Sequence, residues 1–261
     1  MKARLISDVH LEHHDVYPGT APYTPSDPID LLFLCGDIGD PSHPFYERFV
    51  RDCKKLAENV IVIMGNHEMY GHTIEEASGM IERVAHDCGA VFLNNGVFDI
   101  MGAGRPIRPL RAIGTTLWTT IDDSEAQDIT WHVSDFRCIK GWTCFHHTRS
   151  FERAKKWLET EVKKAADEGV DVVVLTHHVP LMSLGSPEHA GSEVKAAFSV
   201  DLRSFIRDNS HTIRMWCHGH DHYSMRTDVD GVLVVSNQYE GRGYDRNLVL
   251  LYDGSRSRTL A

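Results

Sequence analysis

The sequence of 261 residues contains no long apolar run, and this limits the classes of protein to which it can belong. A membrane-spanning helix requires about 20 consecutive apolar residues, and no stretch of the chain approaches that length. The first seven residues, Met-Lys-Ala-Arg-Leu-Ile-Ser, resemble the start of a strand and lack the apolar core and the small-residue cleavage site of a secretory signal. We therefore expect a cytoplasmic protein without a membrane partner.

Paired cysteines are also missing. The six cysteines are scattered along the chain without C-x-x-C spacing, whereas disulfide frameworks are typical of small secreted domains. We predict reduced thiols. Cys35 and Cys217 stand inside apolar runs beside candidate metal ligands, and free cysteines in such runs usually behave as small buried apolar residues rather than ligands.

An excess of positive charge is absent as well. The chain has 27 Lys and Arg against 37 Asp and Glu, which gives a formal net charge of -10. Proteins that grip nucleic acid electrostatically carry a basic patch, so nucleic acid is expected here only as a substrate. Carboxylates that bind cations nevertheless create a locally positive site for phosphate esters. The length and the 42% hydrophobic content are sufficient for a single domain over residues 1–261.

What the sequence does contain is five short segments rich in side chains that bind metal ions. Most of them follow short, β-branched apolar runs of the kind that form buried strands. In chain order they are Asp8-Val9-His10, Gly36-Asp37-Ile38-Gly39-Asp40, Gly65-Asn66-His67-Glu68, His177 and Gly219-His220-Asp221-His222. Ligands that follow the carboxyl ends of strands meet at one edge of a sheet, so the five segments predict one site.

Two of these segments place ligands two residues apart. Residues i and i+2 of an extended chain point the same way, so Asp8 and His10 can chelate one ion. His220 and His222 can reach neighbouring positions in the same manner, one for each of two ions. Two divalent cations about 3.5–4 Å apart can clamp a phosphoryl group and ionise a water between them, and the pattern therefore favours phosphoryl chemistry.

The remaining residues complete such a centre. Asp37 is the natural bridge between two ions, and Asn66 offers a neutral oxygen that does not repel phosphate. His177 completes the set of ligands around the second ion. His67 is better placed to contact the substrate, where its protonated ring could donate to the leaving-group oxygen. We predict that Asp40 holds the other N–H of this ring and favours its charged form.

In this order the segments resemble the motifs of the calcineurin-like metallophosphoesterases: D-x-H, G-D-x-x-D, G-N-H-[DE], an isolated His and G-H-x-H. The resemblance spans residues 8–222 and implies an α/β fold, an α/β/β/α sandwich of two mixed β-sheets with the metal site at the strand C-terminal ends. It also implies the ligands: one ion takes Asp8, His10, Asp37 and His222, and the other takes Asp37, Asn66, His177 and His220. Nitrogen and oxygen ligands suit Mn²⁺, our first choice, and also Fe, Zn²⁺ or Ni²⁺.

Departures from the family pattern narrow the expected activity. Ser/Thr protein phosphatases carry G-D-x-x-D-R-G, but here Pro41 and Ser42 follow Asp40, so the phosphate-binding arginine is missing. Purple acid phosphatases carry a tyrosine at the place that Asp40 occupies here, so we do not expect an Fe(III)–tyrosinate. Residues 113–118, Ile-Gly-Thr-Thr-Leu-Trp, resemble small bacterial and phage-type members.

We therefore expect a hydrolase in which metal-bound hydroxide attacks phosphorus in line, without a phosphoenzyme. Phosphodiesters are the favoured substrates. The alternatives are a broad phosphomonoesterase and a nuclease acting on small or single-stranded nucleic acid. A non-catalytic scaffold is a further alternative, but it would be expected to have lost ligands, and all seven positions are filled here.

Three residues are candidates for substrate contacts. Tyr70 could stack on a substrate ring or be an ordinary rim tyrosine, His72 could line the pocket, and Arg242 could meet an anion or be solvated. The irregular segment 119–150, rich in Asp, Trp and His, is interpreted either as a lid over the site or as a solvated insertion.

Helical spacing of apolar residues and helix-capping residues predict four helices. Their ranges are 44–58, 73–88, 151–168 and 192–208. Turn residues between apolar runs predict hairpins over 97–118 and 225–236, and the stretch that begins at Ala90 looks antiparallel.

Overall fold

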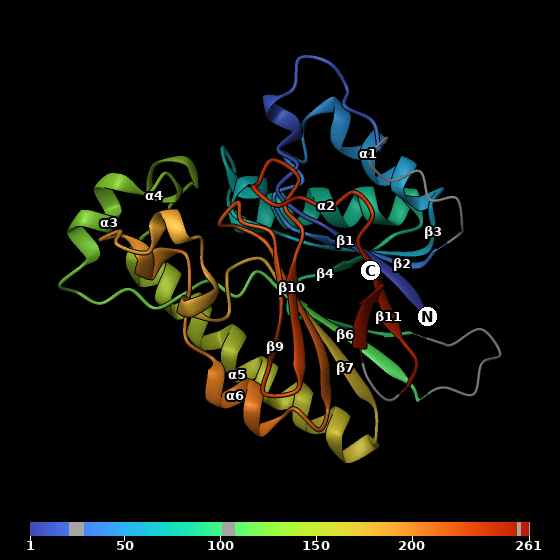
Figure 1. The fold of residues 1–261 in the computed structure, drawn as a ribbon. Coiled ribbons are helices and arrows are strands. Elements are labelled where there is room, and N and C mark those ends of the chain that lie inside the picture. Colours follow the sequence, from blue (N-terminus) through green and yellow to red (C-terminus); the bar gives the residue numbers. More distant parts are fainter. Residues whose placement is uncertain (21–28, 101–107, 255–256, 261) are drawn as a thin grey trace.

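The protein is described by a computed structural model that covers residues 1–20, 29–100, 108–254 and 257–260. Two six-stranded mixed sheets pack together between helices (Figure 1). In spatial order the first sheet contains β12 (Ser257–Leu260), β11 (Val249–Tyr252), β1 (Lys2–Ile6), β2 (Ile29–Cys35), β3 (Ala57–Ile63) and β4 (Val91–Leu93). The predicted α/β/β/α sandwich is confirmed.

The second sheet has parallel strands at its centre and antiparallel strands at its edges. Its spatial order is β5 (Gly96–Ile100), β6 (Leu110–Thr115), β7 (Asp171–Thr176), β8 (Ile213–His218), β10 (Val232–Ser236) and β9 (Met225–Val229). The two antiparallel pairs, β5 with β6 and β9 with β10, are the predicted hairpins. Most of the connection expected within the first hairpin lies outside the described residues.

Helices cover the outer faces of both sheets (Figure 1). α1 (Pro44–Lys54) and α2 (Ile74–Cys88) pack on the first sheet. α5 (Cys144–Glu168) and α6 (Arg203–Asp208) pack on the second, while α3 (Ala126–His132) and α4 (Asp135–Cys138) extend to one side.

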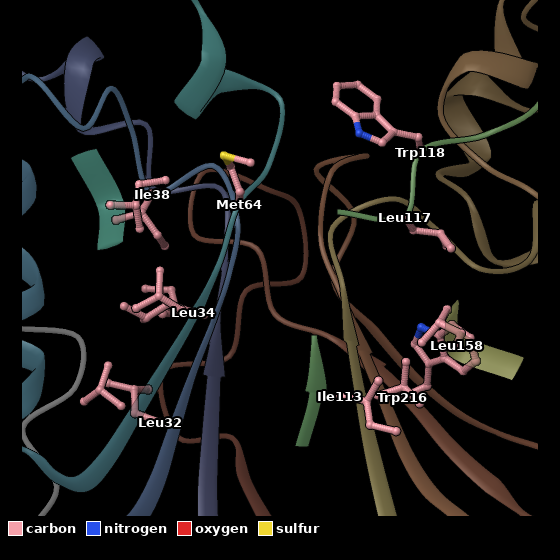
Figure 2. Close-up of a cluster of buried hydrophobic side chains, with 14 of the residues drawn as sticks. Leu32, Leu34, Ile38, Met64, Ile113, Leu117, Trp118, Leu158 and Trp216 are labelled. Atoms are coloured by element: carbon pink, nitrogen blue, oxygen red, sulfur yellow. The ribbon is translucent and has the colours of Figure 1, made fainter. Parts of the chain in front are cut away.

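The strands are buried on both faces, which explains their continuous apolar sequences. In β2, Leu31 and Phe33 face the core between the sheets, whereas Leu32 and Leu34 belong to the cluster beneath the helices. Figure 2 shows this second cluster, with Leu32 and Leu34 on one outer face and Trp216 on the other. Side chains that alternate in this way fix the register of the strand, because a shift by one residue would exchange the two faces.

Four predictions of local structure need correction. The helix predicted over 44–58 ends at Lys54, and Ala57 and Glu58 belong to β3. The stretch from Ala90 forms β4, which pairs parallel to β3. The helix predicted to start at Phe151 begins at Cys144, where the Thr143 side chain accepts from the backbone N–H of His146. The single helix predicted over 192–208 is broken, because residues 198–200 form backbone hydrogen bonds with Val179.

Candidate metal centre

The parallel strands of both sheets deliver the five ligand segments to one end of the sandwich. β1, β2 and β3 run parallel in the first sheet, and β7 and β8 run parallel in the second. Asp8, Asp37 and Asn66 follow the three strands of the first sheet, while His177 and His220 follow the two of the second. The convergence expected from the strand order is therefore present in the fold.

The backbone at these ligands is turned rather than extended. Among the described residues, nine non-glycine residues have positive φ, and five of them are predicted ligands: Asp8 (55°), His10 (49°), Asp37 (51°), His220 (85°) and His222 (53°). The expectation that ligands two residues apart align on an extended chain is therefore wrong. Such conformations cost about 1–3 kcal/mol each and cluster at functional sites.

One group of ligands surrounds His10. Its Nε2 lies 3.1 Å from Nε2 of His222 and 4.0 Å from Oδ2 of Asp37. Oδ1 of Asp8 lies 3.7 Å from Nε2 of His222. Ligand atoms of Asp8, His10 and His222 all lie within 4.8 Å of one another, which is close enough for a single cation.

A second group surrounds His177. Its Nε2 lies 3.2 Å from Oδ2 of Asp37 and 3.0 Å from Oδ1 of Asn66. His220 joins Asp37 and His177 within 4.8 Å, and its Nε2 is buried without a hydrogen-bond partner. A buried imidazole nitrogen without a partner calls for an explanation, and a bound ion provides one. The donor set therefore fits two ions that share Asp37.

The electrostatics of the protein without metal reflect this crowding. Burial disfavours protonation of His177, but Asp37 and Asp8 outweigh it and raise its pKa to about 10. His10 is similar: burial opposes its charge, while Glu12, Asp37 and Asp8 together raise its pKa to about 9. Carboxylates thus hold protons on these two imidazoles at the positions where cations would bind.

Glu68, the last residue of the third segment, holds the loop that carries Asp37. It is fully buried, and its carboxylate accepts from the backbone N–H groups of Gly65 at 2.7 Å, Asp37 at 2.9 Å and Ile38 at 2.7 Å. Gly65 lies so close that a Cβ there would clash with the Asp37 carboxylate. Sequence reasoning gave Glu68 no role, although the acidic residue of G-N-H-[DE] was the available signal.

The structure places Glu12, rather than Asp40, against the proposed acid His67. Oε1 of Glu12 lies 2.9 Å from Nδ1 of His67, and the imidazole stacks on Tyr70, with ring centroids 4.3 Å apart. Asp40 instead lies 3.2 Å from Nε2 of His72. The predicted Asp40 to His67 contact is replaced because the 3₁₀ turn after the first segment brings Glu12 into that position.

A cavity of about 330 Å³ opens over both ligand groups. One wall comes from α3 and α4, and another from residues around the 181–200 loop. The lining residues are Asp37, Asn66, His67, Tyr70, His132, Val133, Ser134, Asp135, His189, Phe198, His220, Asp221 and His222. Of the predicted substrate contacts, Tyr70 lines this cavity. His72 and Arg242 do not line it, and Arg242 pairs with Glu188 at 2.6 Å.

In the described part of the chain, no helix combines the length and apolar character needed to cross a bilayer. The six cysteines are free.

A two-sheet sandwich with a shared aspartate among histidines at its strand ends has the side chains to hold two metal ions. The chain belongs to the calcineurin-like phosphoesterase family, whose model matches residues 1–224. It is therefore a metal-dependent enzyme that hydrolyses phosphate esters. The family uses a dimetal centre, and this chain carries candidate His and Asp ligand groups for it.

The chain is 25% identical over 269 residues to the uncharacterized protein L509 of Acanthamoeba polyphaga mimivirus, covering 94% of this chain and 92% of the relative. Its fold is similar to that of a phosphopantetheinyl hydrolase from Mycobacterium tuberculosis, with a TM-score of 0.73 and 15% identity over 99% of this chain and 95% of the other. A dimetal phosphatase from Danio rerio matches with a TM-score of 0.53 and 14% identity over 99% and 98% of the two chains.

Proposed function

We propose that the chain hydrolyses small phosphodiesters with two divalent ions, manganese first among the candidates, in a single catalytic domain. The ions would be held by Asp8, His10, Asp37, Asn66, His177, His220 and His222. The observation that carries this proposal is the position of Asp37, whose Oδ2 lies 3.2 Å from His177 and 4.0 Å from His10. One carboxylate therefore belongs to both ligand groups, as a bridging ligand must.

When bound, two such ions supply Lewis-acid stabilisation of a phosphoryl group and lower the pKa of a coordinated water. The protein itself supplies the proton for the leaving group. His67 is held at Nδ1 by Glu12 and lines the cavity, so its Nε2 is the atom from which the proton is donated. Burial opposes the charge on His67, but Asp37 and Glu12 outweigh it and raise its pKa, which favours the protonated ring that this task requires.

The neutral ligand Asn66 and the cavity lining support a diester. No lysine or arginine is among the described residues that line the cavity, so the ions and the proposed acid His67 would have to neutralise the substrate. A diester monoanion needs less neutralisation than a monoester dianion. The volume of about 330 Å³ is at the lower end of the range for small-molecule sites, which favours a small ester over a polymer.

This proposal is tested with metal-stripped protein and three substrate types: bis-p-nitrophenyl phosphate, p-nitrophenyl phosphate and cyclic nucleotides. Each of Mn²⁺, Fe²⁺, Zn²⁺ and Ni²⁺ is restored in turn. We expect activity only after metal is restored, with Mn²⁺ the most effective and the diester cleaved faster. Faster cleavage of the monoester would overturn the substrate order, and activity without any metal would overturn the proposal as a whole.

A further inference from the structure

Asp135 in the 119–150 segment contacts one of the proposed ligands. Its Oδ1 accepts from Nδ2 of Asn66 at 2.9 Å and from the hydroxyl of Tyr70 at 2.8 Å. The side chain is 2% exposed, so this carboxylate is buried where charge is costly. Because this buried carboxylate accepts a hydrogen bond from a proposed metal ligand, it is a candidate for a role in the metal centre.

The contact decides which way the amide of Asn66 points. A primary amide has one donor end and one acceptor end, and an ionised carboxylate only accepts. The NH₂ group of Asn66 must therefore face Asp135. Its Oδ1 then faces His177, 3.0 Å from Nε2, where the second ligand group converges. With the amide reversed, its oxygen would oppose the carboxylate and its NH₂ group would face the cation.

Asp135 itself is held in place by the backbone. The N–H of Gly71 donates to the carbonyl of Cys138 at 2.8 Å, and the N–H of Lys140 donates to the carbonyl of His72 at 2.9 Å. Between them, Tyr70 and Ile139 form an antiparallel bridge. The helix that carries Asp135 is thus bonded to the chain directly after the third ligand segment.

We propose that Asp135 is a positioning residue of the metal centre, which turns the amide oxygen of Asn66 toward the second ion. The inference rests on the proposed function, because it takes Asn66 as a ligand. It gives the 119–150 segment a direct part in metal binding, beyond covering the cavity.

Titration calorimetry with Mn²⁺ on metal-stripped protein tests this role. Removing a group that orients a metal ligand typically lowers metal affinity by about 10–100-fold. We expect Asp135→Ala to lower the affinity for one of the two ions by this amount and to leave the affinity for the other unchanged. Asp135→Asn keeps an oxygen that can accept from both partners, so its loss should be smaller. Asp128→Ala, an exposed residue of the same segment, is the matched control and should bind as the wild type does.

A reciprocal exchange distinguishes positioning from general support of the fold. Asn66→Asp alone places two carboxylates next to each other, and their repulsion should lower the affinity for the second ion. Adding Asp135→Asn reverses donor and acceptor, so we expect the double variant to bind that ion at least about tenfold more tightly than Asn66→Asp does. Additive effects in this cycle would overturn the inference, and the cycle remains decisive even when Asp135→Ala does not fold.

The outcomes separate the two proposals. If the wild type binds two ions and Asp135→Ala binds both with the same affinity, the positioning role is overturned and the proposed function stays intact. Wild-type protein that binds fewer than two ions overturns the proposed dinuclear centre itself.

Discussion

Oε1 of Glu12 lies 2.9 Å from Nδ1 of His67, so the carboxylate that faces the proposed acid comes from the turn after the first ligand segment. The same oxygen is 3.4 Å from Nδ1 of His10. One side chain thus links a proposed metal ligand to the proposed proton donor. Burial opposes the charge on Glu12, but hydrogen bonds from both histidines outweigh it and keep its pKa below the usual range.

Glu12→Gln should move the basic limb of the pH profile of kcat to lower pH. His67 acts as an acid, so activity is lost as pH rises through its pKa. Glu12 raises that pKa, and its neutralisation lowers it, which brings the loss to a lower pH. The profile is measured with a diester at saturating Mn²⁺. Asp40→Asn is the control, because its carboxylate contacts His72, and an equal shift in that variant would contradict the assignment.

His67→Ala should reduce kcat by about 10²–10⁴-fold, the range for loss of a general acid. Metal content should stay at the wild-type value, because His67 is outside the seven proposed ligands. Activity and metal content are measured on the same preparation. A bis-p-nitrophenyl ester has a good leaving group that needs little protonation, so the loss should be smaller there than with an alkyl ester. Equal losses would argue against proton donation.

Asn66→Ala should remove one ion and spare the other. The amide oxygen lies 3.0 Å from His177 and belongs only to the second group. Elemental analysis after dialysis against a weak chelator should show close to one ion per chain. Retention of both ions would mean that Asn66 is not a ligand.

Metal uptake near neutral pH should release protons. In the metal-free protein the pKa of His177 is raised to about 10 and that of His10 to about 9, so both rings are charged at pH 7. Metal binding requires neutral imidazoles, and affinity should therefore rise with pH up to about these values. Calorimetry in buffers of different ionisation enthalpy should give up to two protons released per chain. Heats that do not depend on the buffer would contradict the prediction.

Asp171→Asn should lower the free energy of unfolding without changing metal affinity. Asp171 is fully buried and accepts from the Tyr252 hydroxyl at 2.7 Å, with Arg108 at 3.2 Å and Arg214 at 3.0 Å. Because the arginines are partly exposed, the expected loss is about 2–3 kcal/mol, measured by urea denaturation. Asp171 lies at the start of β7, at the end of the strand opposite the candidate ligands. Weakened metal binding would therefore contradict the prediction.

The convergence of the seven candidate ligands could be predicted because it depends on patterns local in the sequence, and the sandwich followed from the resemblance of those motifs to the family. Apolar runs that end in polar residues mark the strands, and the ligands are the residues directly after them. The contacts of Glu12 and Asp135 could not be predicted, because each joins segments that are distant in sequence. The start of α5 was missed for a related reason, since His147 is polar in sequence yet fully buried in the fold.

The pairing of β1 with both β2 and β11 has a consequence for how the protein is made. The first ligand segment follows β1, but β11, one of the two neighbours of β1, is translated long after it. A nascent chain therefore exposes an unpaired edge of β1 until β11 has been synthesised, and open edges of this kind invite association with other chains. Conditions of synthesis that slow translation before β11 is made should increase aggregation of this protein.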